Sequence, residues 1–132
     1  MGKSLDFETK KMYANYAIKW CKNFFGENEK KRTKLHIEVT ERKRTIKQHE
    51  VFGNYCFYRN KITIHTSTCE TLYDVVSTII HEYTHYLQSR NMYKYYEKNY
   101  YYSTNPYERE ARRNENKYTK TCINEIKKLA SK

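Results

Sequence analysis

The sequence contains few residues that interrupt regular structure: only three glycines and one proline occur among its 132 residues. This scarcity argues against a flexible linker or a low-complexity chain. Long hydrophobic runs are also missing, which argues against a membrane-spanning helix and against a membrane partner. The length and the hydrophobic fraction of 38% predict one small domain over residues 1–132, with a thin core.

No two of the four cysteines have the C-x-x-C spacing that is typical of a zinc ribbon or a thioredoxin-type site. Residues 1–25 also lack the uninterrupted apolar segment and the small-residue cleavage site of a secretory signal peptide. We therefore expect a soluble cytoplasmic protein with reduced, mostly buried thiols. These thiols are Cys21, Cys56, Cys69 and Cys122.

Acidic residues are scarce relative to basic ones: 15 Asp and Glu stand against 26 Lys and Arg, which gives a formal net charge of +11. Such a surface attracts phosphate backbones and acidic proteins. The cations are spread along the chain instead of forming one run, so solubility explains the charge equally well. Binding to nucleic acid through this basic surface is therefore one open alternative, and the oligomeric state is not indicated.

Hydrophobic periodicity predicts a mixed α and β chain that begins with a helix over residues 6–25, capped by Asp6 and ended by Gly26. The core-facing stripe of this helix is predicted as Met12, Tyr13, Tyr16, Ala17, Trp20, Cys21 and Phe24. Three strands are then expected, at residues 35–39, 51–58 and 61–66. The polar segment 41–50 is predicted to be a solvated turn.

The stretch Ser67-Thr68-Cys69-Glu70 fits a capping box and predicts a helix that runs to about Gln88. Its apolar face is predicted as Leu72, Val75, Val76, Ile79, Ile80, Tyr83 and Leu87. Residues 89–104 are rich in tyrosine and show no clear element of their own. A last helix is expected from Asn105-Pro106 to about Leu129.

The stretch His81-Glu82-Tyr83-Thr84-His85 is the most informative part of the chain, because it is an H-E-x-x-H motif within a predicted helix. Residues four apart lie on one face of a helix, so His81 and His85 can hold one Zn²⁺. Glu82 can then act as the general base toward a zinc-activated water. Both histidines project nearly opposite the centre of the apolar face, toward water or a polar cleft.

A catalytic zinc usually takes a third protein ligand, and two glutamates compete for this role. Glu108 lies roughly 50° from the centre of the last helix's apolar face and Glu110 roughly 110°, which favours Glu108. Glu108 also stands three residues after Asn105, where it could complete a capping box instead. His65 is interpreted as an exposed strand residue, not as a ligand.

Hydrolysis would also need a donor for the developing negative charge on oxygen, and tyrosine can supply one. Three tyrosines near Glu108 are candidates, with none preferred: Tyr101, Tyr102 and Tyr107.

The strand pair, the helix that ends in His81–Gln88 and the last helix opening with Asn105-Pro106-Tyr107-Glu108-Arg109-Glu110-Ala111 together resemble small gluzincin-type zinc metallopeptidases. The resemblance is to minigluzincins and to the ImmA/IrrE-type peptidases of phages and mobile elements, and it covers roughly residues 51–130. It implies Glu108 as the third zinc ligand, and a sheet whose edge strand pairs with an extended protein or peptide substrate.

The chain departs from this family at one position. An Asp or Asn often follows the ligand glutamate by four residues, and here that position holds Arg112. Asn114 keeps the spacing only from Glu110, which leaves Glu110 as the alternative ligand.

The sequence thus predicts a single α+β, zincin-like domain with an N-terminal helix packed against a small three-stranded sheet, an active-site helix and a C-terminal helix. The predicted function is zinc-dependent hydrolysis of peptide bonds inside a cell, in keeping with the host cell of a phage or mobile element. Two other classes stay open: a catalytically inactive zinc-binding protein, and a basic module whose tyrosines stack on nucleic-acid bases.

Overall fold

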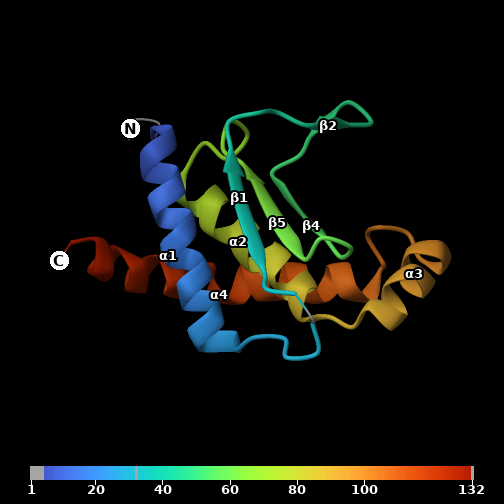
Figure 1. Ribbon diagram of the computed structural model, residues 1–132. Coiled ribbons are helices and arrows are strands. Elements are labelled where there is room, and N and C mark those ends of the chain that lie inside the picture. Colours follow the sequence, from blue (N-terminus) through green and yellow to red (C-terminus); the bar gives the residue numbers. More distant parts are fainter. Residues whose placement is uncertain (1–4, 32, 132) are drawn as a thin grey trace.

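The computed structural model describes residues 5–31 and 33–131, which form a small α+β arrangement (Figure 1). The helices are α1 (Phe7–Phe25), α2 (Leu72–Leu87), α3 (Arg90–Asn99) and α4 (Pro106–Ala130). The strands are β1 (His36–Thr40), β2 (Thr45–Ile46), β3 (His49–Glu50), β4 (Gly53–Cys56) and β5 (Lys61–His65). In the described residues, no helix has the length and apolar character needed to cross a membrane.

The three predicted strands form one sheet in the order β1-β5-β4, with β1 parallel and β4 antiparallel to the central strand β5. Ile62 and Ile64 of β5 are fully buried, as their alternation with polar residues predicts. The segment interpreted as a solvated turn instead contains the small hairpin β2–β3. Lys47 and Gln48 between its strands both have positive φ, as the common two-residue hairpin turn requires. The strands were not predicted because the residues on both sides of this turn are exposed and show no alternation of apolar and polar side chains.

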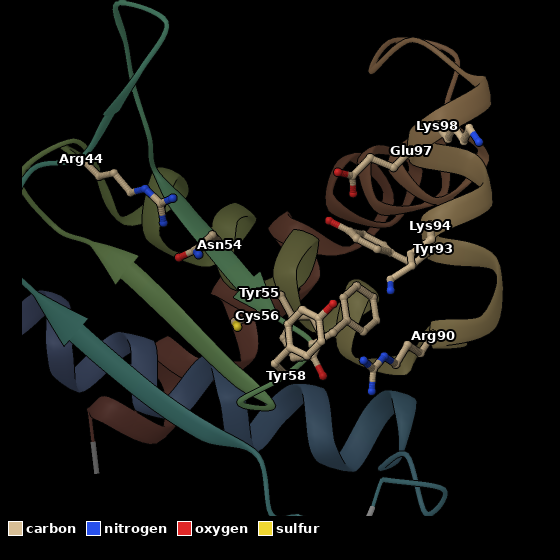
Figure 2. A pocket seen from close by; sticks show the side chains of 11 residues that line it. Arg44, Asn54, Tyr55, Cys56, Tyr58, Arg90, Tyr93, Lys94, Glu97 and Lys98 are labelled. Carbon is tan, nitrogen blue, oxygen red and sulfur yellow. The ribbon is translucent and has the colours of Figure 1, made fainter.

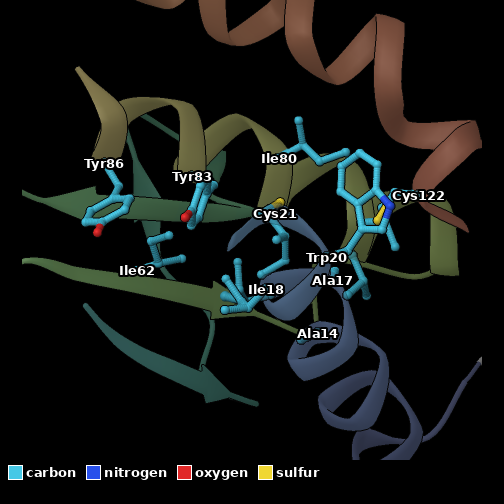
Figure 3. Packing of buried hydrophobic residues seen from close by; sticks show 14 of the residues in the cluster. Ala14, Ala17, Ile18, Trp20, Cys21, Ile62, Ile80, Tyr83, Tyr86 and Cys122 are labelled. Carbon is cyan, nitrogen blue, oxygen red and sulfur yellow. The ribbon is translucent and has the colours of Figure 1, made fainter. Parts of the chain in front are cut away.

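Helix α2 lies at the centre of the fold, where it contacts the sheet and also helices α1 and α4 (Figure 1). The predicted packing of the N-terminal helix on the sheet is therefore only part of the arrangement, since α1 also contacts α2 and α4. Figure 3 shows side chains from α1, β5, α2 and α4 meeting in one core, among them Ile18, Ile62, Ile80 and Cys122. All four cysteines are free, and three of them are buried.

The predicted caps of α1 are confirmed: the Asp6 side chain accepts a hydrogen bond from the Thr9 amide, and Gly26 ends the helix with φ 84°. The predicted buried stripe is partly wrong. Ala14 and Ile18 belong to the core, whereas Met12 and Phe24 are 40% and 52% exposed. The small Ala14 and Ala17 are fully buried, so the stripe facing α2 is centred on them and not on the larger aromatic residues.

The predicted start of α2 is also wrong. The capping box is formed by Thr71 and Asp74, so the helix begins at Leu72 and not in the stretch from Ser67 to Glu70. The amides of Thr68 and Cys69 instead bond to the carbonyl of His65, which holds this stretch in a turn at the end of β5.

Two further sequence interpretations need correction. His65 is buried, not exposed, and its Nδ1 lies 2.8 Å from the carbonyl oxygen of Arg42, in the connection that covers the end of β5. Residues 90–99, expected to lack an element, form α3. None of its residues is buried, and the stripe of Met92, Tyr93 and Tyr96 was not recognised as helical in a segment where tyrosines also occupy neighbouring positions.

Gly53 of β4 marks the closest approach of the sheet to α2, and it gives the first prediction. A Cβ at this position would lie 2.6 Å from Thr78 Cγ2 and 2.8 Å from the carbonyl oxygen of Thr63. Gly53→Ala should therefore lower the free energy of unfolding by about 1–3 kcal/mol, measured by urea denaturation. Gly53→Val should cost more, because its extra methyl groups meet the same atoms. Equal stability of Gly53→Ala and the parent would contradict this packing.

Candidate metal centre

The crossing of α2 and α4 brings His81, His85 and Glu108 together. His81 and His85 lie one turn apart on α2, and Glu108 lies in the first turn of α4. One Glu108 oxygen lies 3.0 Å from His81 Nε2, and the other lies 3.1 Å from His85 Nε2. All three ligand atoms lie within 4.8 Å of one another. Two imidazole nitrogens and a carboxylate therefore converge from two helices.

The far nitrogen of each histidine has an acceptor of its own. His81 Nδ1 lies 2.8 Å from Oε1 of Glu115, and His85 Nδ1 lies 2.7 Å from Oε1 of Gln88. The carboxylate oxygen of Glu115 and the amide oxygen of Gln88 can only accept, so each Nδ1 carries a hydrogen and each Nε2 is directed toward Glu108. Histidines that bind metals are usually held by such an outer hydrogen bond, which sets the tautomer and the ring orientation.

Glu110 takes part in this arrangement indirectly. The Gln88 side-chain amide donates to Oε1 of Glu110 at 2.7 Å and to the carbonyl of Tyr107 at 3.0 Å. These two donations fix the amide orientation, so that the oxygen of Gln88 is the atom facing His85. Glu110 thus supports His85 through Gln88, while Glu108 is the glutamate that meets the histidines.

Other residues singled out from the sequence have different roles. Asn105 caps α4 by accepting a hydrogen bond from the Tyr107 amide, and Glu108 is directed at the histidines instead of completing a capping box. Asn114 donates to the hydroxyl of Thr84 and does not contact a histidine. The side chain that hydrogen-bonds His81 is instead that of Glu115, seven residues after Glu108.

The charges of the centre are strongly coupled. Burial by itself lowers the pKa of His81, but hydrogen bonds to Glu108 and Glu115 outweigh this effect and raise it to about 10. The pKa of His85 is raised as well, against the effect of burial, chiefly through its hydrogen bond to Glu108. Burial opposes ionisation of Glu108, yet hydrogen bonds from the two histidines hold its pKa well below the ordinary range. Without a metal, the histidines thus favour protonation and Glu108 favours the ionised form.

Glu82 is a buried carboxyl group beside this cluster, with 8% of its surface exposed. Burial raises its pKa, and the neighbouring His81 and His85 act in the opposite direction. In the described residues, no side chain or amide hydrogen-bonds its carboxylate. A carboxyl group with a raised pKa and no fixed partner is a better proton acceptor than an ordinary glutamate.

The nearby tyrosines divide into two groups. The hydroxyl of Tyr107 donates to the carbonyl of Ser89 at 2.9 Å, and Tyr101 is 83% exposed. The hydroxyl groups of Tyr102 and Tyr93 are influenced by the charges of Glu108 and Glu82. Although 67% of Tyr102 is exposed, partial loss of hydration at its hydroxyl and the charges of Glu108 and Glu82 raise its pKa to about 12. Burial and the charges of Glu97, Glu108 and Glu82 raise the pKa of Tyr93 to about 12 as well.

These residues fit a zinc ion. Two imidazole nitrogens and one carboxylate are a common catalytic donor set, with ligand atoms about 2.0–2.1 Å from the metal. At a tetrahedral angle, two such atoms are about 3.3 Å apart. Oε1 of Glu108 lies 3.0 Å from His81 Nε2 and 3.2 Å from His85 Nε2, and the whole set of ligand atoms lies within 4.8 Å, so the chemistry of the donors carries the fit more than their spacing.

Comparison of the chain with protein-family models, with curated proteins and with solved structures gives no match in any of the three. The geometry and chemistry of the centre therefore carry the functional argument.

Sequence reasoning placed Gln88 beside the histidines without assigning it a role, and it gave no role at this centre to Glu115 or Tyr93. Helical spacing carried a signal for two of them, since Glu115 lies two turns after Glu108 on α4 and Gln88 lies three residues after His85. Tyr93 lies on α3, whose existence the sequence did not reveal.

Proposed function

We propose that this chain is a zinc-dependent metallopeptidase of zincin-like fold, in which His81, His85 and Glu108 hold the metal. The observation that carries the proposal is the convergence of both Nε2 atoms on Glu108, with the buried Glu82 next to them. The resemblance to gluzincin-type peptidases supports the same assignment. The free cysteines are in keeping with a cytoplasmic setting.

A bound zinc would supply Lewis-acid activation of a water nucleophile and of the substrate carbonyl. The chain's residues would do the remaining work. Glu115 and Gln88 hold the imidazoles in the tautomer that directs Nε2 toward the metal. Glu82 accepts the proton from the attacking water and returns it to the leaving amine, because its raised pKa suits both steps.

Two tyrosines are the proposed donors to the oxygen on which negative charge develops. Since their pKa values are raised to about 12, Tyr93 and Tyr102 keep their hydroxyl hydrogens at neutral pH and can donate hydrogen bonds. Tyr102 is one of the three residues considered from the sequence, and Tyr93 adds a donor from α3.

Metal removal tests this proposal. Protein freed of metal by a chelator should take up one zinc per chain at neutral pH and then cleave a fluorescein-labelled casein, whereas the metal-free protein should not. Zinc must displace the protons favoured on His81 and His85, so its affinity should increase with pH, by up to about a hundredfold per unit for two protons. Isothermal titration in buffers of different ionisation enthalpy measures the released protons.

His85→Ala provides the control, since it should release fewer protons and bind zinc weakly. A metal-free chain that takes up no zinc at neutral pH would contradict the proposal. Zinc uptake without cleavage would instead favour the inactive zinc-binding protein that the sequence left open.

A further inference from the structure

A groove of about 600 Å³ lies between β4 and α3. Figure 2 shows its two walls, with Tyr55 and Tyr58 on the side of the sheet and Arg90, Tyr93 and Lys94 on α3. Helix α3 also contacts α4, where Tyr96 packs against Tyr107, the residue before Glu108, with 5.0 Å between the ring centroids. A molecule in this groove would therefore lie beside the helix that packs on the start of α4.

The α3 wall carries a row of cations. Arg90, Lys94 and Lys98 are four residues apart, all are exposed, and all line the groove. Figure 2 shows them one after another along the helix. Among the described residues, no salt bridge joins any of them to an acidic side chain, even though Glu97 lines the same groove. This wall therefore offers positive charge that the described chain does not neutralise.

The opposite wall is an open sheet edge. Among the described strands β4 pairs with β5 alone, and residues 54–56 of β4 line the groove, so the other edge of β4 is available for pairing there. Arg44 adds a fourth cation on this side, also without a salt-bridge partner in the described residues. An extended peptide can pair with such an edge through its backbone, which a nucleic acid cannot do.

We propose that this groove selects substrates with acidic side chains at alternate positions of an extended segment, which contact Arg90, Lys94 and Lys98. The inference rests on the proposed peptidase function and specifies its substrate class. The spacings agree: four residues of helix advance about 6 Å, and alternate side chains of an extended strand lie about 6.7 Å apart on one face. Glutamates at every second position can thus meet successive cations of α3.

The proposal is tested with the Glu82→Gln variant loaded with zinc, so that bound peptides are not cleaved. Three fluorescein-labelled peptides of equal length are compared by anisotropy: one with glutamates at alternate positions, one with the same glutamates adjacent, and one with glutamines at alternate positions. The alternating acidic peptide should bind most tightly, and the Lys94→Glu/Lys98→Glu variant should weaken it about tenfold or more. A peptide with lysines at the same positions should then bind the reversed variant better than the parent.

The matched control is Lys127→Glu/Lys128→Glu, which makes the same charge change on exposed residues at the far end of α4. An equal loss of binding in this control, or equal binding of all three peptides, would overturn the proposal. Tighter binding of a single-stranded oligonucleotide, weakened by the same α3 variant, would overturn it in favour of nucleic acid. Cleavage of casein by the parent is measured in parallel, so that failure of the groove proposal and failure of the peptidase proposal are distinguished.

Discussion

Replacing Glu82 with glutamine should leave zinc uptake unchanged and lower peptide hydrolysis by about a hundredfold to ten-thousandfold. The amide has nearly the shape of the carboxyl group but cannot accept the proton of the attacking water. Because Glu82 is not among the three converging ligand atoms, the metal should stay bound. The measurement combines zinc content by mass spectrometry with the rate of cleavage of labelled casein.

Glu70→Gln is the matched control, because it makes the same chemical change on an exposed glutamate outside the centre. It should retain the parent rate. Cleavage by Glu82→Gln at the parent rate would remove Glu82 from the mechanism, and a simultaneous loss of zinc would assign it a structural role instead.

Replacing Glu108 with alanine should weaken zinc affinity by more than about a hundredfold, whereas Glu110→Ala should weaken it by about tenfold at most. Loss of a direct ligand should exceed the effect of a supporting partner, which is typically 10–100-fold. Glu110 acts on His85 only through Gln88, so it belongs to the weaker class. Zinc affinity should be measured by competition with a chelator on protein shown to be folded by circular dichroism.

The reverse order of these two variants would contradict the arrangement of the centre. It would mean that Glu110 reaches the metal, which requires α4 to be rotated by about half a turn. Equal losses in the two variants would mean that Gln88 and Glu110 matter as much as a direct ligand.

The sequence was sufficient to predict the main elements of the centre. A strong apolar face on α2 fixed the helix phase and thus the direction of His81 and His85, and the same phase argument on α4 favoured Glu108, which is the glutamate that meets both histidines. The roles of these residues in binding metal and in catalysis stay predictions. The sheet also followed from alternation, since Ile62 and Ile64 of β5 alternate with polar residues and are both buried.

Other features depend on tertiary contacts that a single sequence does not display. The pairing of Glu115 with His81 requires the crossing of α2 and α4, which no local pattern specifies. Helix α3 has no buried residue, and its aromatic stripe is masked by the other tyrosines of the segment, so periodicity did not single it out. The stretch from Ser67 to Glu70 has the residue spacing of a capping box, but it does not form one. Thr71 and Asp74 have the same three-residue spacing, lie closer to the apolar face of α2, and form the capping box.

The raised pKa values of His81 and His85 affect how the centre would exchange protons for zinc. Two protons carry the same charge as one Zn²⁺, so replacing the protons of both imidazolium rings by the ion would leave the total charge between α2 and α4 unchanged. Glu108 would stay ionised in both states, attracted first by the two rings and then by the metal. The attraction between Glu108 on α4 and the positive charge on α2 would thus be present with or without zinc. The ion could then leave and return without a change in the net charge of the centre, and the fold would persist.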